Sequence, residues 1–127
     1  MKEIVYTKSA PEAIGPYSQA VKVKVTEMLF CSGQLPIDTN TNQIISGSPI
    51  EETRKVMDNL KDIIEAADYS MNDVVKTTIY LTDLSVFKEV NEVYASYFHG
   101  SFPARSTVQV STLPKGATIE IDMIACK

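Results

Sequence analysis

Hydrophobic and polar residues alternate along several short stretches of the chain, which is the pattern of a β-strand with one buried face. The alternation covers residues 21–25, 75–81 and 119–123, while residues 28–32 form an apolar run and residues 4–7 predict a short edge strand. Because a two-residue turn, Thr26-Glu27, separates the strand at 21–25 from the run at 28–32, we expect a hairpin at this point.

Two other stretches repeat apolar residues every three or four positions, as amphipathic helices do. The first helix begins at Ser48-Pro49-Ile50-Glu51, which offers a capping hydroxyl, a proline at the first helical position and a glutamate for a capping box. Its apolar stripe covers residues 56–67, and a second stripe over residues 87–98 ends at His99-Gly100. The predicted order is β-β-β-α-β-α-β-β, an α+β fold with one mixed sheet of about five or six strands and both helices on one face.

Two helices cover only one face of such a sheet, so the other face must be exposed or covered by something else. The side chains expected on the uncovered face are polar, a mixture unsuited to a core: Lys76, Thr78 and Tyr80, with Thr107, Gln109, Glu120 and Asp122. Either this face is solvated or it meets other subunits around a polar cavity of ligand size.

Length and composition indicate one domain over residues 1–127, because 127 residues with 44% hydrophobic content are enough for one core and too few for two. The net charge is −4 and there is no cluster of five or more basic residues, so a nucleic-acid partner is disfavoured. The N-terminus has no apolar leader, and no apolar run is long enough to cross a bilayer. We therefore expect a cytoplasmic protein without membrane contact.

The last quarter of the chain carries the most informative pair of residues. It reads as two strands joined by a Pro/Gly turn region. In the first strand Val108 and Val110 are expected on the apolar side, so Arg105, like Glu120 in the second strand, is expected on the polar side. If the strands neighbour one another, or meet across a subunit contact, they place a cation for a small anion beside a carboxylate that can move a proton. Each residue alone also fits an ordinary surface position, and the two could simply form an ion pair.

Other candidates have equally ordinary alternatives. Tyr17 is either an aromatic residue at the rim of a site or a buried ring that needs one hydrogen bond. Ser32 and Gly33 lie at a strand end, where a glycine opens backbone groups to a ligand or simply makes a turn. His99, the only histidine, is best explained as a residue at a helix C-terminus.

The chain lacks the usual signatures of metal and cofactor chemistry. Its cysteines, Cys31 and Cys126, lie far apart in apolar runs and predict buried, reduced thiols. There is no Cys/His metal pattern, no Ser/His/Asp triad and no Gly-rich phosphate loop, so we expect neither a metal nor a cofactor.

Several motifs together identify a family resemblance that spans essentially the whole chain. They are Gly15-Pro16-Tyr17-Ser18-Gln19-Ala20, Ser32-Gly33-Gln34, residues 76–83, Phe87 with Val90-Asn91, Pro103-Ala104-Arg105-Ser106, Leu113-Pro114 and Ile119-Glu120-Ile121. In this pattern the chain resembles the RidA (YjgF) family, and the presence of both Arg105 and Glu120 is similar to its catalytic branch.

The resemblance implies a chorismate-mutase-like α+β subunit that forms a homotrimer, with sheets facing inward and three clefts between subunits. It also implies an imine deaminase, which hydrolyses reactive enamines and imines such as 2-iminobutanoate and 2-iminopropanoate, released by pyridoxal-phosphate-dependent dehydratases, to 2-keto acids and ammonia. No cofactor is implied.

The resemblance further implies a role for each candidate residue. Arg105 would hold the substrate carboxylate through two parallel hydrogen bonds, and Glu120 would position a water and move a proton to the departing nitrogen. Backbone groups near Ser32, Gly33 and Thr107 would contact the imine nitrogen or the water, and Tyr17 would shape the rim. Several family members carry cysteine where this chain has Thr107, so a reactive thiol at that position is excluded.

Two other functions stay open from the sequence. The same clamp could serve a noncatalytic regulator that binds small keto or amino acids without turnover. An endoribonuclease, an activity also attributed to the family, is opposed by the negative charge and by the absence of paired histidines.

Overall fold

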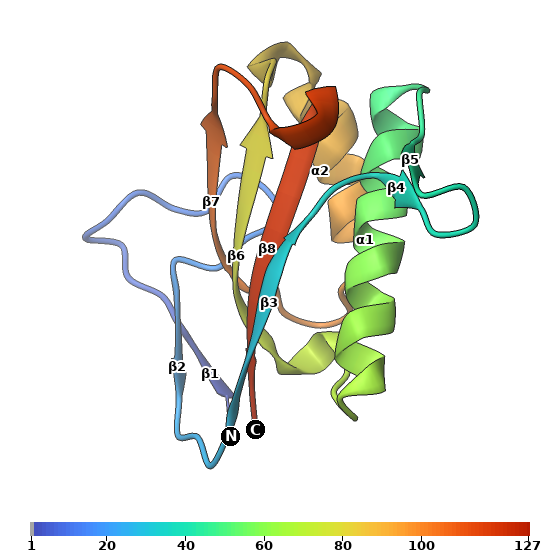
Figure 1. Ribbon diagram of the computed structural model, residues 1–127. Helices are drawn as coiled ribbons and strands as arrows, with labels where there is room; N and C mark the ends of the chain where they lie inside the picture. The colour runs from blue at the N-terminus through green and yellow to red at the C-terminus, as the bar shows by residue number, and fades with distance from the viewer. Residues whose placement is uncertain (1) are drawn as a thin grey trace.

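The computed structural model describes residues 2–127 and is built around a four-stranded mixed sheet (Figure 1). The strands lie in the order β3, β8, β6, β7, with bounds Met28–Gln34, Ile119–Cys126, Val74–Leu81 and Ala104–Gln109. Strand β8 is antiparallel to both of its neighbours, whereas β6 and β7 run parallel. The parallel pair requires a crossover, and the chain between β6 and β7 supplies it with a helix.

Both long helices lie on one face of this sheet (Figure 1), as the apolar stripes predicted. Helix α1 spans Pro49–Ala66 and helix α2 spans Phe87–Ala95. The Ser48 hydroxyl accepts a hydrogen bond from the Glu51 backbone N–H at 3.2 Å, which satisfies one of the free donors at the start of α1. Short 3₁₀ turns, η1 at Met71–Asp73, η2 at Leu84–Val86 and η3 at Pro114–Gly116, connect the main elements.

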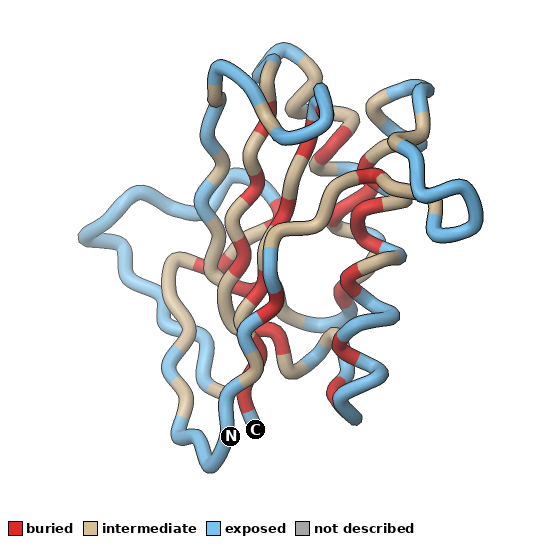
Figure 2. The backbone as a smooth tube through the Cα atoms, in the orientation of Figure 1, coloured by how far each residue is buried: buried red, intermediate tan, exposed pale blue. Residues whose placement is uncertain are grey.

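The core lies between the helices and the sheet (Figure 2). Alternate residues of β6 and β8 are buried there, as expected for strands with two different faces. The largest fully buried side chains come from both layers: Met57, Leu60 and Ile64 from α1, Tyr94 from α2, and Ile79, Leu81, Ile119, Ile121 and Met123 from the sheet. No helix within residues 2–127 has the length and apolar composition needed to cross a bilayer.

The N-terminal strands differ from the prediction. Strand β2, Ala20–Val23, pairs with β1, Lys2–Val5, in a separate ribbon, and β3 pairs with the C-terminal strand β8. The expected hairpin between residues 21–25 and 28–32 is therefore wrong. The backbone N–H groups of Thr26 and Glu27 bond instead to the carbonyl of Lys127, at 2.7 and 3.1 Å, and the segment lacks the glycine or asparagine that favours a tight hairpin turn.

The main sheet also has four strands where about five or six were expected. The remaining pairing is local, because β4, Ile37–Asp38, and β5, Gln43–Ile44, form only a small hairpin beside α1. The α+β architecture with both helices on one face is nevertheless confirmed.

Candidate active site

Arg105 lies on the edge strand β7 and is held by residues of α2 and of the N-terminal loop. One guanidinium nitrogen donates a hydrogen bond to the Asn91 side-chain oxygen at 2.8 Å. The guanidinium carbon lies 5.6 Å from the ring centre of Tyr17, 5.4 Å from that of Phe87 and 5.3 Å from that of Tyr94. Burial lowers the pKa of Arg105, but a guanidinium remains charged in proteins. Most of its N–H donors stay available for a ligand.

The face on which Arg105 lies differs from the prediction. In the β6–β7 register Arg105 pairs with Thr77, whose hydroxyl is hydrogen bonded to that of Tyr94 at 2.7 Å on the helix side. Arg105 therefore faces the helices and not the uncovered face. Thr107 and Gln109 lie on the same face of β7 as Arg105, because they pair with the buried residues Ile79 and Leu81. The prediction was wrong because β7 is an edge strand, and its valine, Val108, is exposed with 42% of its surface accessible.

The Thr77–Tyr94 pair forms the floor beneath Arg105. Both residues are fully buried, and burial raises the pKa of Tyr94 to about 12, so the phenol stays protonated. We expect Thr77→Val to cost about 1–3 kcal/mol of unfolding free energy in urea titrations, because it leaves the Tyr94 hydroxyl buried without a partner. The double variant Thr77→Val/Tyr94→Phe should recover part of this loss, since it removes both polar groups. Additive losses would contradict a direct pair.

Tyr17 reaches Arg105 because the loop that carries it is fixed to the start of β7. The Ser18 backbone N–H bonds to the Pro103 carbonyl at 3.1 Å, and the Ser18 hydroxyl donates to the carbonyl of Phe102. Gly15, with φ of 141°, allows the tight turn in which the Tyr17 N–H bonds to the Gly15 carbonyl at 2.9 Å. The structure therefore brings Tyr17, which the resemblance placed at the rim of the site, next to Arg105.

Glu120 lies on the other face of the sheet. It pairs with Tyr80 in the β6–β8 register and is half-buried on the face without helices. Its carboxylate lies directly over Gly33, where a Cβ atom would be 2.0 Å from Oε2 of Glu120. Ser32 is exposed beside it, at the irregularity of β3 between Cys31 and Gln34. A side chain at position 33 would therefore displace the carboxylate.

The candidate residues thus form two groups in one chain. We call Tyr17, Arg105 and Thr107 the arginine half-site, and Ser32, Gly33 and Glu120 the glutamate half-site. Strand β6 separates β7 from β8, and the two half-sites use opposite faces of the sheet. The idea that neighbouring C-terminal strands join Arg105 to Glu120 within one chain is therefore wrong.

The Thr107 hydroxyl is buried and has no hydrogen-bond partner among residues 2–127. Buried polar atoms are rarely left without a hydrogen bond, so we expect this hydroxyl to bond to a group from outside the chain. It lies on the same strand face as Arg105, two residues further along β7. The arginine half-site therefore offers a second polar contact besides the guanidinium.

Sequence reasoning assigned no role to three residues of α2 that surround Arg105. Phe87, Asn91 and Tyr94 are spaced by four and three residues, which places them on one face of the helix. An asparagine within an otherwise apolar helical stripe was the signal that could have found this contact. The result is a cation enclosed by rings and fixed in direction by an amide oxygen.

Across residues 2–127, no three or more His, Cys, Asp and Glu side chains are grouped to hold a metal ion. Cys31 and Cys126 are both free and buried, and burial raises the pKa of each thiol. Neither thiol belongs to a half-site.

The family model described as Endoribonuclease L-PSP matches residues 7–127. A RutC family protein of Pyrococcus horikoshii is 53% identical over 127 residues, which cover 100% of this chain and 99% of that protein. The crystal structure of RidA from an Antarctic Psychrobacter species is 43% identical, covers 98% of this chain and 99% of its own, and superposes with a TM-score of 0.76. The chain belongs to the RidA (YjgF) family.

The RidA family includes relatives whose names state a reaction. The mouse protein named 2-iminobutanoate/2-iminopropanoate deaminase is 45% identical over 125 residues, which cover 98% of this chain and 91% of that protein. The family resemblance read from the sequence motifs is confirmed, as is the RidA fold. At the level of the family, imine hydrolysis is the activity that these names support.

Proposed function

We propose that this RidA-family protein hydrolyses 2-imino acids, such as 2-iminobutanoate and 2-iminopropanoate, to 2-keto acids and ammonia. The arginine half-site carries this proposal. The Arg105 guanidinium is half-buried, is enclosed by three rings and keeps most of its donors free. An arginine in this setting is better suited to binding a small carboxylate than to forming a surface ion pair. The names of relatives such as the mouse deaminase support the same reaction.

In the proposed reaction Arg105 binds the substrate carboxylate through two parallel hydrogen bonds and so fixes the imine carbon. Glu120 accepts a proton from a water molecule while the water oxygen bonds to the imine carbon, and it returns this proton to the nitrogen, which gives a carbinolamine. Glu120 then takes the proton of the new hydroxyl group and passes it to the same nitrogen. The C–N bond breaks as the C=O bond forms, so ammonia leaves and the keto acid remains. Proton transfer by a positioned carboxylate contributes about 10²–10⁴ in rate. Neither a metal nor a cofactor takes part.

The opposite orientation of the half-sites leads us to propose that each complete site lies between two subunits. The arginine half-site of one chain would face the glutamate half-site of another, in the homotrimer that the family resemblance implies. Apolar side chains on the face without helices support this arrangement. Phe30 is 69% and Met28 48% accessible in the single chain, and such exposure favours an interface.

We further propose that the protein acts in the cytoplasm, on imines released by pyridoxal-phosphate-dependent dehydratases. The two free buried cysteines accord with a reducing compartment.

A dehydratase-coupled assay tests the proposed reaction. A threonine dehydratase generates 2-iminobutanoate, and the appearance of 2-oxobutanoate is followed with and without this protein. We expect keto-acid formation to accelerate in proportion to added protein. If the protein binds 2-oxobutanoate in calorimetry but the imine decays at its rate in buffer, the noncatalytic regulator is the better description.

The close approach of Gly33 to Glu120 gives a prediction of its own. In Gly33→Ala the new methyl group would overlap the carboxylate, with the Cβ atom 2.0 Å from Oε2. We expect imine hydrolysis to fall by about 10²-fold, because small displacements of a reacting group have effects of that size. Gly47→Ala is the matched control, since its Cβ would meet only the side chain of Glu51, at 3.0 Å or more, and Glu51 lies outside both half-sites. Equal activity of the two variants would contradict the placement of Glu120.

RNA cleavage is the second candidate, because the matching family model is described as an endoribonuclease. The net charge of −4 opposes it, since binding to a phosphate backbone gains most from basic residues. We expect any RNA cleavage in a preparation to survive Glu120→Ala and to disappear on further purification. Cleavage that copurifies with the protein and is lost in Glu120→Ala would favour the ribonuclease.

A further inference from the structure

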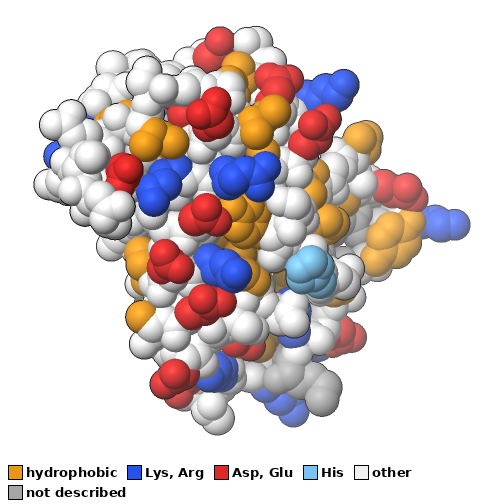
Figure 3. Space-filling model, turned by 90° about the vertical axis from the view of Figure 1, so that its right-hand side faces the viewer, with side chains coloured by type: hydrophobic (Ala, Val, Ile, Leu, Met, Phe, Trp, Pro, Cys, Tyr) orange, Lys and Arg blue, Asp and Glu red, His pale blue; other side chains and the backbone are white. Residues whose placement is uncertain are grey.

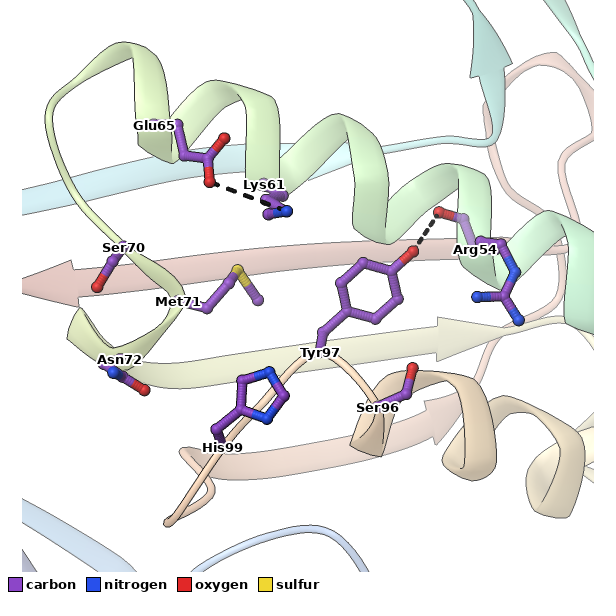
Figure 4. A pocket seen from close by; sticks show the side chains of 9 residues that line it. All are labelled: Arg54, Lys61, Glu65, Ser70, Met71, Asn72, Ser96, Tyr97 and His99. Carbon is purple, nitrogen blue, oxygen red and sulfur yellow. Dashed lines mark hydrogen bonds and ion pairs between the residues drawn. The ribbon is translucent and has the colours of Figure 1, made fainter.

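A separate hollow lies on the helix side of the molecule, between α1, η1 and the segment after α2 (Figure 4). Its volume is about 470 Å³, within the range of small-molecule sites. The lining residues that matter here are Arg54, Lys61, Glu65, Met71, Tyr97 and His99. None of them belongs to either half-site, so the hollow is independent of the proposed reaction.

The charge of this hollow is opposite to that of the whole chain. Among the lining residues, Arg54 and Lys61 carry basic side chains and His99 adds an imidazole, against the carboxylate of Glu65, whereas the chain carries −4 overall. The ion pair between Lys61 and Glu65 spans 4.0 Å, and about half of each side chain is accessible. Exposed pairs of this kind are weak, so the Lys61 ammonium is available to another anion.

One wall of the hollow is apolar and fixed. Tyr97 donates its hydroxyl to the Asp58 carboxylate at 2.6 Å, and the Arg54 carbonyl lies 3.2 Å away, so its ring cannot swing out freely. Met71 is half-buried against the core and points toward this ring (Figure 4). Figure 3 shows the same side of the molecule, with hydrophobic atoms in the groove beside the charged side chains of α1.

A fixed apolar wall beside cations suits a ligand that has both a charge and a carbon chain. We propose that the hollow binds a small organic anion with a short apolar body, such as a short-chain carboxylate. The carboxylate lies between Lys61 and His99, and the carbon chain packs against Met71 and Tyr97.

Titration with butanoate, followed by the NMR signals of the Met71 methyl group and the His99 ring, tests this site. The titration is carried out on the Arg105→Ala protein, which lacks the other proposed carboxylate site. Its result therefore does not depend on whether the protein hydrolyses imines. We expect saturable shifts of both signals. Lys61→Glu should weaken binding roughly fivefold or more, because it replaces an attraction by a repulsion. Glu65→Gln should strengthen binding, since it frees the Lys61 ammonium.

Lys88→Glu on α2 is the matched control, because it makes the same charge change at an exposed residue outside the hollow. It should leave the affinity for butanoate unchanged. The proposal is overturned if butanoate produces no saturable shifts, or if Lys61→Glu and Lys88→Glu bind equally well. It is also overturned if formate, which has the same charge and no carbon chain, binds as tightly as butanoate, since the apolar wall would then contribute nothing.

Discussion

Arg105→Ala is expected to lower kcat/KM for imine hydrolysis by roughly 10²-fold or more. Each hydrogen bond to a charged group contributes about 1.5–3 kcal/mol, and two such bonds to the substrate carboxylate are lost. Arg105→Lys should recover little of this activity, although it keeps the positive charge. A lysine has no planar pair of donors, and it could not reach the same contact with the Asn91 oxygen. The dehydratase-coupled assay measures both variants.

Arg54→Ala is the matched control for this prediction, since Arg54 is exposed on α1 and outside both half-sites. It should retain the activity of the unmodified protein. Urea unfolding of Arg105→Ala separates a lost contact from a lost fold, because Arg105 also packs among three rings. A folded Arg105→Ala protein with full turnover would remove the imine deaminase proposal.

The elements that sequence reasoning predicted best are those with two clearly different faces. Alternation in β8 correctly placed Ile119, Ile121 and Met123 in the core and left Glu120 outside it. The apolar stripe of α1 was equally clear, because Leu60 and Ile64 are fully buried under the sheet. Such patterns are local, and burial on one side is enough to produce them.

Arg105 shows why local alternation was not enough for the site. The valine side of β7 was taken for the core side, but β7 is an edge strand, and there the polar side faces the helices. The face of an edge strand is decided by its register with β6, a pairing of distant residues that alternation does not encode. The same holds for Gly33, whose approach to Glu120 depends on the irregular pairing of β3 with β8.

The faces on which Arg105 and Glu120 lie determine how a complete site can be assembled. Placing Arg105 and Glu120 on opposite faces means that a small substrate cannot contact both in one chain. In the proposed reaction, subunits must therefore associate to bring Arg105 and Glu120 to one substrate, whatever the association adds to stability. In the proposed assembly each chain contributes a different half-site to each contact, so the interface is heterologous. Contacts of this kind close into a ring, such as the proposed trimer, where the rotation between subunits allows it.

Subunits carrying Arg105→Ala and subunits carrying Glu120→Gln are each expected to be inactive alone and active together. Glu120→Gln keeps the shape of the side chain but removes the base, so we expect a loss of about 10²–10⁴ in rate. When equal amounts of the two chains are assembled together, the glutamine variant supplies an intact arginine half-site and the alanine variant an intact glutamate half-site. Random assembly in a closed ring makes about one quarter of the sites complete.

Mixing Glu120→Gln with Gly33→Ala chains is the matched control for this experiment. Both substitutions lie in the glutamate half-site, so no arrangement of these chains creates a complete site, and activity should stay at the level of the separate variants. Recovery in the first mixture but not in the second would locate the reaction between chains. If the first mixture is no more active than its two components, Arg105 and Glu120 do not act across a subunit contact. Because Arg105 and Glu120 lie on opposite faces of one sheet, such a result would also separate Glu120 from the substrate held by Arg105.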